Sequence, residues 1–471
     1  MPPDSRRYDL VVIGSGPAGQ KAAICAAKLR KRVLVVDRPD RIGGVSVHTG
    51  TIPSKTLREA VLYLSGFRQR AFYGKDYRLQ DKITVADLAK RVRPVREHEI
   101  EVVRAQLKRN DVDTMHGHAR FVGANEIEIE VEGAGGHVEK VGGDRFLVAC
   151  GTRPAESPSI LLDGEKIWSS DQLAQIPEIP KHLIVVGGGV IGLEYASMLT
   201  ALGGEVTLID ARKQLLDFVD EEIVDTLTFH MRRHGVTFRL GEKVASCSVD
   251  TRGERKVVVA NLESGKTVVA DALLYAVGRQ PNTDLLGLGA VGLDTDSRGR
   301  LVVNEVFQTQ VPHIYAAGDC IGFPALASTS MEQGRIASLH MFGKPQTIAR
   351  NLLPYGIYTI PEISTVGRNE QELTEAKVPY EFGVARYEEL AKAQMIGDRI
   401  GLLKVLFDPK SLEVLGVHAI GENAAEIIHI GQAVMALGGT VEYFRDTVFN
   451  YPTLAEAYKV AALDGLNKLG H

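Results

Sequence analysis

The sequence predicts an α/β protein with two Rossmann-like dinucleotide-binding domains and a C-terminal α+β domain. Two observations indicate the Rossmann-like domains: a Gly-x-Gly-x-x-Gly turn between an apolar strand and a helix occurs near residue 14 and again near residue 187. A third observation indicates the last domain, where strand-like runs such as "IGLLKVLFD" alternate with helical runs such as "AAEIIHIGQAVMAL".

Composition narrows the class of protein. The 471 residues are enough for roughly three domains. A formal net charge of -4 provides no polycationic face, so we expect no nucleic-acid partner. No apolar run approaches the roughly 18 residues of a membrane span, so we expect no membrane partner. The four cysteines are far apart and form no Cys-x-x-Cys pair, so we expect no metal site and a cytoplasmic protein.

The first glycine-rich turn lies in "VVIGSGPAGQKAAICAAKLRKRVLVVD", which ends in an acid at the close of a second strand. The first glycine allows a tight turn, the second lets backbone N–H groups approach a pyrophosphate, and the third lets the helix pack on the strand. The helix N-terminus stabilises the phosphate charge. The acid can accept hydrogen bonds from a ribose. The predicted cofactor-binding residues of this copy are Gly14, Ser15, Gly16, Pro17, Ala18, Gly19 and Asp37.

The second copy, "LIVVGGGVIGLEYASMLTALGGEVTLID", predicts a second dinucleotide site formed by Gly187, Gly189, Gly192 and Asp210. In both copies the acid follows the first glycine by 23 positions (37 − 14 and 210 − 187). Two positions beyond Asp210, the arginine fork of Arg212 would suit the 2′-phosphate of NADP(H), with Lys213 as a weaker second charge or an exposed loop residue. Two dinucleotides are therefore expected.

A third segment, "TQVPHIYAAGDCIGFPALASTSMEQGRIAS", has an apolar strand ending in Gly-Asp and a helix expected to begin near Ala325. At this point the chain resembles the flavoprotein pyridine nucleotide-disulfide oxidoreductases, and the resemblance includes "LVACGTRP", "YAVGRQPNTD", "GIYTIPEISTVG", "GENAAEIIHIGQAVM" and "FNYPTLAEAYKVAALDGLNKL". It implies that Asp319 binds the ribityl chain of a non-covalent FAD. Further cofactor contacts implied by the resemblance are Gly43, Gly44, Ser46, Thr51, Gly151, Gly278 and Ala327.

The resemblance also implies the order of the domains. The FAD-binding domain takes residues 1–150 and resumes at 282–342, the NAD(P)-binding domain takes 151–281, and an interface domain takes 343–471. A homodimer or larger homo-oligomer is expected, in which the partner's C-terminal segment lies near the flavin. NADP(H) and NAD(H) are the expected substrates.

The stretch "GGVSVHTGTIPSK" departs from the disulfide-active relatives. Ser46 and Thr51 hold the positions of their two redox cysteines, and Tyr451 replaces the histidine of their His-Glu pair, while Glu456 remains. A single introduced change at position 46 would not account for the other two differences. Hydroxyl groups cannot form a disulfide or serve as thiolates, so the route to a disulfide substrate is closed.

The resemblance assigns a catalytic pair: Lys55 in "IPSK" corresponds to a lysine near flavin N5, and Glu194 in "GLEYA" corresponds to the glutamate that pairs with that lysine. The expected reaction is transfer of hydride from NADPH to NAD+ through FAD, a ping-pong transhydrogenation of the Si-specific type. Two alternatives stay open: an NAD(P)H diaphorase or quinone reductase, and a non-catalytic flavin-binding sensor or assembly protein. The retained pair argues against the latter. Lys21, His418, His429 and the cysteines are interpreted as structural.

Overall fold

The computed structural model describes residues 6–74, 76–80, 82–131, 136–344, 346 and 352–470, with the backbone alone at 173–175. The chain divides into two compact units. Unit 1 comprises Met1–Thr56, Ala89–Ala155 and Gly278–Ile348, and unit 2 comprises Leu57–Leu88, Glu156–Val277 and Ala349–His471. Helices α3 (Thr51–Ser65) and α5 (Val85–Lys108) each have residues in both units. The four-segment division expected from the sequence stays a prediction.

Unit 1 is built on an eight-stranded sheet with the order β1-β6-β5-β4-β3-β2-β7-β18. Neighbours from β4 to β18 run parallel, whereas β4, β5 and β6 pair antiparallel. Strands β8 and β17 form a separate antiparallel pair. The strands are β1 (Arg6–Tyr8), β2 (Leu10–Ile13), β3 (Val33–Asp37), β4 (Asp113–Gly123), β5 (Glu126–Val131), β6 (His137–Gly143), β7 (Phe146–Val148), β8 (Thr152–Pro154), β17 (Arg279–Pro281) and β18 (Ile314–Ala316).

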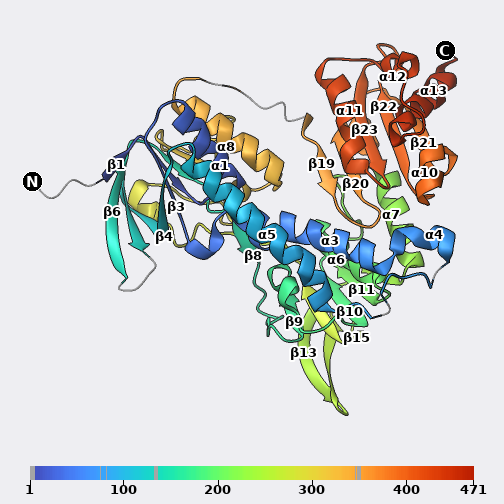
Figure 1. Cartoon of the computed structure of the whole chain (residues 1–471), viewed down its shortest axis with the longest axis horizontal. Coiled ribbons are helices and arrows are strands. Elements are labelled where there is room, and N and C mark those ends of the chain that lie inside the picture. The colour runs from blue at the N-terminus through green and yellow to red at the C-terminus, as the bar shows by residue number, and fades with distance from the viewer. Residues whose placement is uncertain are drawn as a thin grey trace, which may run out of the picture. The chain divides into compact units, whose positions relative to one another are not determined.

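The first glycine-rich turn follows β2, a central strand of this sheet. All four residues of β2 are buried, as expected for an apolar strand covered on both faces. Helix α1 (Pro17–Lys28) begins directly after the turn and packs against α8 (Ala327–Met341), beside which it lies in Figure 1. A short helix, α2 (Val45–His48), precedes α3. Helix α8 begins two residues later than expected, because Leu326 is extended and caps it.

The middle part of unit 2 contains a five-stranded parallel sheet with the order β12-β11-β10-β16-β9 and a three-stranded antiparallel sheet, β13-β14-β15. The second glycine-rich turn follows β10, the central strand of the parallel sheet. The elements are α4 (Arg70–Tyr73), β9 (Ile167–Ser169), β10 (His182–Val186), α6 (Val190–Ala201), β11 (Glu205–Asp210), α7 (Glu221–Arg233), β12 (Val236–Leu240), β13 (Val244–Arg252), β14 (Arg255–Leu262), β15 (Thr267–Ala270) and β16 (Ala272–Tyr275).

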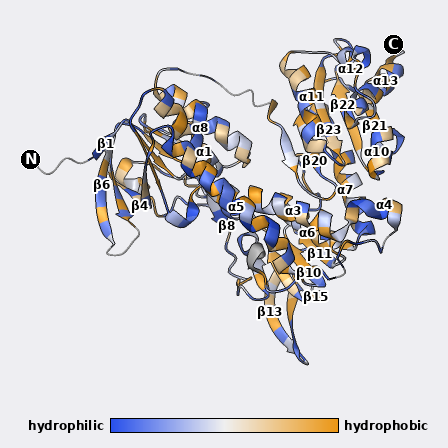
Figure 2. Ribbon diagram, viewed as in Figure 1, coloured by the Kyte–Doolittle hydropathy of each residue, from blue (hydrophilic) through white to orange (hydrophobic). Residues whose placement is uncertain are grey.

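The C-terminal part of unit 2 is an antiparallel sheet, β19-β20-β23-β22-β21, against which α11 and α13 pack. Figure 2 shows hydrophobic residues along β22 and β23, and every residue of β22 is buried. Its elements are β19 (Tyr355–Ile357), β20 (Ile363–Gly367), α9 (Glu370–Glu375), β21 (Glu381–Arg386), α10 (Ala391–Ile396), β22 (Leu402–Phe407), β23 (Val414–Ile420), α11 (Ala424–Ala436), α12 (Glu442–Asp446) and α13 (Ala457–Leu469).

The predicted fold class is confirmed: two α/β regions each place a Gly-x-Gly-x-x-Gly turn after a buried parallel strand, and an α+β region follows. The runs read as strands and helix near the C-terminus form β22, β23 and α11. None of the helices in the described ranges combines the length and apolar character that a membrane crossing requires.

His230, on α7, makes the stability of unit 2 sensitive to acid. Burial, His234 and Arg233 lower its pKa to about 3, so the native state keeps it neutral. In the unfolded chain His230 binds a proton below about pH 6.5, and this favours unfolding. The stability of the native state is therefore unaffected by His230 above that pH and decreases as pH falls toward 3. Between pH 7 and 5 the loss is about 2 kcal/mol. We expect His230→Phe to remove that part of the decline, as measured by urea unfolding at both pH values; an unchanged decline would contradict this.

Candidate active site

The turn after β2 requires its three glycines for different reasons. Gly14 has φ +104°, and a Cβ there would lie 2.3 Å from the Ala149 carbonyl oxygen. A Cβ on Gly19 would lie 1.9 Å from the Gly14 carbonyl oxygen. Gly16, by contrast, has an extended backbone, and the nearest neighbour of an added Cβ would be Gly44 Cα at 3.9 Å. Neither strain nor protein contact explains Gly16, so the open space beside it fits the approach of a pyrophosphate.

Asp37, at the end of β3, is hydrogen-bonded to this turn. Its Oδ2 accepts hydrogen bonds from the backbone N–H and the hydroxyl of Ser15, both at 2.6 Å. Ser15 Oγ in turn accepts a hydrogen bond from the Gly43 N–H at 2.9 Å. A Cβ on Gly44 would lie 2.8 Å from Gly16 Cα. Burial raises the pKa of Asp37, and the hydrogen bonds from Ser15 oppose that rise. The fold therefore brings these predicted FAD residues together.

Asp319 lies just after β18 and has partners that the sequence analysis did not single out. Its Oδ2 accepts a hydrogen bond from the Thr152 hydroxyl at 3.4 Å. Arg279 donates to the Thr152 hydroxyl at 2.8 Å and to its carbonyl oxygen at 2.9 Å. Burial raises the pKa of Asp319, and the charge of Arg279 opposes that rise. Thr152 and Arg279 belong to the motifs "LVACGTRP" and "YAVGRQPNTD", which carried the resemblance, so these motifs could have indicated them.

The remaining predicted cofactor residues of unit 1 lie at turns and helix starts. Gly151 and Gly278 have φ of +62° and +79°, and no described atom lies within 4 Å of a Cβ added at either. These positive angles favour glycine, and the surrounding space leaves room for a ligand. Ala327 is the first residue of α8. Ala18, on α1, lies beside the glycine that precedes Asp319, because a Cβ added to Gly318 would lie 3.3 Å from the Ala18 side chain.

The segment from Gly43 to Lys55 carries hydroxyls at positions 46 and 51, where the resemblance implies thiols in disulfide-active proteins. Ser46, in α2, donates a hydrogen bond to the Gly43 carbonyl oxygen at 3.0 Å. Thr51 is exposed and begins α3, and Lys55 lies one turn further along that helix. This segment therefore presents no group that could form a disulfide.

The cysteines of the chain are all free thiols, and those of unit 1 fit the structural interpretation. Cys320 is fully buried, with its Sγ 3.5 Å from the Val148 carbonyl oxygen. A hydrogen bond with Cys320, together with burial, raises the pKa of Cys150 well above its usual range. A raised pKa disfavours the reactive thiolate, so Cys150 is poorly suited to disulfide exchange.

The turn after β10 repeats the steric pattern of the first turn. Gly187 has φ +105°, and a Cβ there would lie 2.6 Å from the Ala276 carbonyl oxygen. A Cβ on Gly192 would lie 1.9 Å from the Gly187 carbonyl oxygen. Gly189 is extended and caps α6, and no described atom lies within 4 Å of a Cβ added to it. The middle glycine again borders open space at a helix N-terminus, where a second pyrophosphate fits.

Asp210, at the end of β11, is paired with Arg212. The Arg212 guanidinium donates from Nε to Oδ1 at 3.1 Å and from Nη2 to Oδ2 at 2.9 Å. The backbone N–H groups of Arg212 and Gly188 donate to the same carboxylate at 2.7 Å and 2.6 Å. Burial opposes the charge of Asp210, but Arg212 and these hydrogen bonds hold its pKa below the usual range. Lys213 is exposed. Asp210 is therefore held at the turn in this structure.

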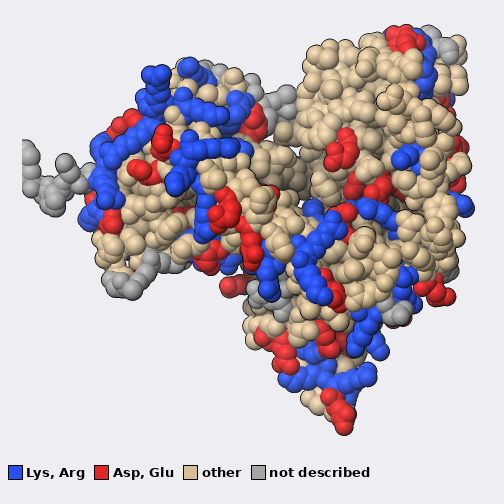
Figure 3. All heavy atoms as spheres, viewed as in Figure 1, with Lys and Arg blue, Asp and Glu red and all other residues tan. Residues whose placement is uncertain are grey.

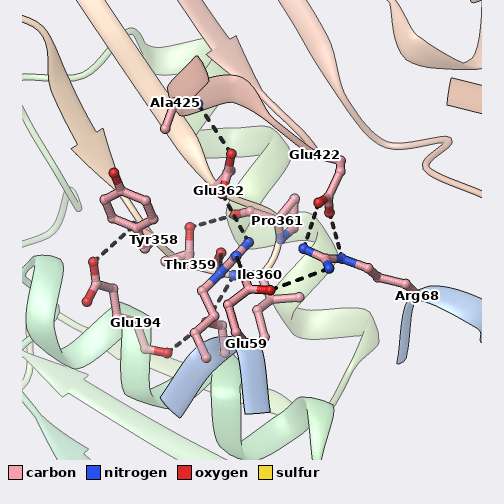
Figure 4. Close-up of polar contacts among 12 residues, drawn as sticks. Glu59, Arg68, Glu194, Tyr358, Thr359, Ile360, Pro361, Glu362, Glu422 and Ala425 are labelled. Atoms are coloured by element: carbon pink, nitrogen blue, oxygen red, sulfur yellow. Dashed lines mark hydrogen bonds and ion pairs between the residues drawn. The ribbon is translucent and has the colours of Figure 1, made fainter. Parts of the chain in front are cut away.

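Glu194 lies on α6, two residues after Gly192, and is 3% exposed. Its Oε1 accepts a hydrogen bond from the Tyr358 backbone N–H at 2.9 Å. Figure 4 shows this contact within a larger polar network that includes Arg68, Glu362 and residues of the segment after β19. The buried carboxylate is thus held by a backbone donor that the sequence analysis did not single out.

Two family profiles match the chain. The profile described as "Pyridine nucleotide-disulphide oxidoreductase" matches residues 8–334, and that described as its "dimerisation domain" matches residues 353–462. The chain belongs to the pyridine nucleotide-disulphide oxidoreductase family. It is therefore an oxidoreductase that uses FAD and NAD(P)(H), and the open space at Gly16 and Gly189 fits two dinucleotides.

Curated relatives share nearly the whole chain. A protein of Mycobacterium tuberculosis named "Soluble pyridine nucleotide transhydrogenase" is 53% identical over 464 residues, covering 98% of each chain. A protein of Citrobacter koseri with the same name is 45% identical over 472 residues, covering 99% of this chain and 100% of the relative.

Solved structures agree with the fold. LpdA from Mycobacterium tuberculosis has a TM-score of 0.87 at 30% identity, and covers 97% of this chain and 99% of its own. The HOCl-induced flavoprotein disulfide reductase RclA from Escherichia coli has a TM-score of 0.85 at 26% identity, with the same coverage.

Replacing Asp319 by alanine is expected to weaken FAD retention. The change removes a charged acceptor, and hydrogen bonds to charged groups contribute about 1.5–3 kcal/mol, or roughly 10-fold to 150-fold in the dissociation constant. Equilibrium dialysis of FAD measures the change. Asp294→Ala is the control, because this exposed aspartate lies in the same unit. Equal FAD affinity in the two variants would remove Asp319 from the cofactor site.

Proposed function

We propose that the chain transfers hydride from NADPH to NAD+ in a ping-pong cycle, with both dinucleotides using the turn after β10 alternately. The observation that carries this proposal is the combination of Ser46 and Thr51 with a second glycine-rich turn whose Gly189 borders open space. FAD, when bound, supplies the hydride chemistry. Because the segment 43–55 offers no thiol, electrons have no path to a disulfide there. The names of the relatives at 45–53% identity support the same activity.

The residues proposed for this reaction have distinct roles. Lys55 supplies a positive charge for the flavin, and Glu194 balances buried charge in the nicotinamide pocket. Asp37 and Asp319 bind FAD through its ribose and ribityl hydroxyls, and Asp210 binds the adenosine ribose of NAD(H). The two glycine-rich turns bind the pyrophosphates, which enter the space beside Gly16 and Gly189.

The dimerisation domain supports a homo-oligomer. On the face shown in Figure 3, the surface over α11 and β23 is mostly uncharged. The C-terminal part of unit 2 also has exposed apolar side chains, among them Leu437, Val448 and Tyr451. Such a surface favours burial against another chain. We propose that Tyr451 and Glu456 lie near the flavin of the partner in a homodimer, and that the enzyme is cytoplasmic.

The proposed function is tested by following reduction of a thionicotinamide analogue of NAD+ by NADPH. Initial rates at several fixed concentrations of NADPH should give parallel double-reciprocal lines, as a ping-pong cycle requires. Intersecting lines would contradict the cycle. Faster reduction of a quinone than of the analogue would favour the quinone reductase, and no turnover with either acceptor would favour the sensor.

Thiol chemistry is expected to be unnecessary for activity. The enzyme should reduce neither lipoamide nor oxidised glutathione at a significant rate, because residues 46 and 51 carry hydroxyls. Alkylation of the partly buried thiols with iodoacetamide should leave the rate of reduction of the NAD+ analogue within about 2-fold, since Cys320 is fully buried and the pKa of Cys150 is raised. Rapid turnover of either disulfide would show that another thiol carries electrons.

A further inference from the structure

The segment Tyr358–Glu362, which joins β19 to β20, is hydrogen-bonded to α6 at two points (Figure 4). The Tyr358 N–H donates to Glu194 Oε1 at 2.9 Å, and the Ile360 N–H donates to the Ser197 hydroxyl at 3.1 Å. Ser197 itself donates to the Glu194 carbonyl oxygen at 2.8 Å. The position of this segment therefore determines where the donor to the Glu194 carboxylate lies.

Arg58, on α3, holds the same segment from a different helix. Its Nε donates to the Thr359 carbonyl oxygen at 3.0 Å, and its Nη2 lies 3.3 Å from Glu362 Oε2. Its Nη1 donates to Glu59 at 3.0 Å. Arg58 is 3% exposed and Thr359 and Glu362 are also buried, so the two contacts with the segment are shielded from water. The Glu59 side chain is 38% exposed. A guanidinium fork reaches three acceptors in fixed directions, which the single ammonium of lysine cannot reproduce.

The Arg58–Glu362 pair is buried on both sides. The Arg58 side chain is 4% exposed and that of Glu362 is 9% exposed. Burial raises the pKa of Glu362, and the charge of Arg58 opposes that rise. Removing one partner of such a pair leaves an uncompensated buried charge, so the segment would be released or displaced.

Arg68 offers a matched comparison in the same network. Its ion pairs go to Glu422 at 2.6 Å and to Glu59 at 3.6 Å. Its side chain is 37% exposed, so these pairs are partly screened by water. Figure 4 shows Arg68 and Glu422 on one side of the segment and Glu194 on the other.

We propose that Arg58 is a positioning residue for Glu194, acting through the backbone of the segment Tyr358–Glu362. Arg58 fixes Thr359 and Glu362, and the segment in turn presents the Tyr358 N–H to the Glu194 carboxylate. This inference rests on the proposed role of Glu194 in the nicotinamide pocket. It assigns to Arg58 a function in hydride transfer without contact with either dinucleotide.

The first test uses the cofactor-free chain and amide hydrogen exchange. In Arg58→Lys, the amides of Tyr358 and Ile360 should exchange about 10-fold to 150-fold faster, the effect of losing a hydrogen bond from a charged group. Arg68→Lys should leave both amides within about 2-fold of the wild type. Unchanged exchange at Tyr358 in Arg58→Lys would overturn the proposal.

The second test asks whether Arg58 acts through Glu194. Oxidation of NADPH is followed with ferricyanide as acceptor, so that the result does not depend on transhydrogenation. Arg58→Lys should lower kcat by at least about 10-fold and change KM for NADPH by less than about 2-fold, since a positioning effect falls on the reacting geometry. The double variant Arg58→Lys, Glu194→Gln should be no slower than Glu194→Gln alone. If the fold-losses in kcat of the two single variants multiply in the double variant, Arg58 and Glu194 act independently, and the proposal is overturned.

A second variant keeps the proposal falsifiable if Arg58→Lys does not fold. Glu362→Gln keeps the shape and a hydrogen-bond acceptor but removes the charge that Arg58 pairs with. It should raise exchange at Tyr358 and lower kcat in the same direction as Arg58→Lys. If Arg58→Lys does not fold and Glu362→Gln has the wild-type exchange rate at Tyr358 and the wild-type kcat, then Arg58 contributes to stability alone and the proposal is overturned.

Discussion

Lys404→Met is expected to destabilise unit 2 by about 3–5 kcal/mol, because it removes one partner from a buried ion pair. Lys404, on β22, is fully buried, and its Nζ lies 3.0 Å from Asp220 Oδ1 and 3.3 Å from Glu222 Oε2. It also pairs with Glu370. Asp220, likewise fully buried, would keep its charge without a cation. Urea unfolding at pH 7 measures the loss.

Lys468→Met is the control for this variant, because both lysines lie over the Phe382 ring, Lys404 at 4.9 Å and Lys468 at 4.1 Å. The Lys468 side chain is 37% exposed and pairs with Asp464, so its loss should cost about 0–1 kcal/mol. Adding Asp220→Asn to Lys404→Met should restore part of the stability, since asparagine keeps an N-cap for α7 without the charge. Equal stability of the two single variants would contradict the expectation.

The effect of Lys404 should also depend on alkaline pH. Burial alone would lower its pKa, but the ion pairs with Asp220 and Glu370 outweigh burial and raise it. A lysine whose pKa is higher in the folded state contributes its full stabilisation below the pKa of the unfolded chain, about 10.4. That contribution to stability is lost as pH rises through the folded-state pKa. The stability difference between wild type and Lys404→Met should therefore be constant from pH 7 to about 10 and then shrink.

The sequence was sufficient to predict features that depend on local geometry. Each Gly-x-Gly-x-x-Gly turn connects a strand to the helix that follows it. The backbone atoms that exclude a Cβ at Gly14 and Gly19 belong to this strand-turn-helix motif or to Ala149, which follows the neighbouring strand β7. Asp37 and Asp210 could be predicted from the sequence because each is the last residue of the strand that follows the helix of its motif. Spacing along the chain encodes such contacts.

Contacts between distant segments could not be predicted in this way. Arg58 and Thr359 are 301 positions apart, and Lys404 and Asp220 are 184 apart. Their types alone suggest solvated surface charges, because arginine and lysine are seldom buried. Only the packing of α3, β22 and the segment after β19 shows that these charges are shielded and paired.

The pairing of Arg212 with Asp210 changes how one site could accept both NAD(H) and NADP(H). An unneutralised Asp210 would repel a 2′-phosphate, whereas Arg212 offsets its charge in the cofactor-free chain. Half of the Arg212 side chain is exposed, so it can leave the carboxylate for a phosphate without loss of buried packing. Two backbone N–H groups, those of Gly188 and Arg212, still hold Asp210 when the guanidinium leaves.

Arg212→Ala is therefore expected to weaken NADPH binding by roughly 10-fold to 150-fold and to leave NADH binding nearly unchanged. The range corresponds to the loss of a charge-assisted contact of about 1.5–3 kcal/mol with the 2′-phosphate, which NADH lacks. Dissociation constants for both cofactors at one fixed salt concentration measure the effect. Lys213→Ala is the matched control, because this neighbouring cation is exposed and should change NADPH binding by less than about 2-fold. Equal losses for NADPH and NADH in Arg212→Ala would instead assign Arg212 to the shape of the turn, and a larger loss in Lys213→Ala would make Lys213 the phosphate-binding residue.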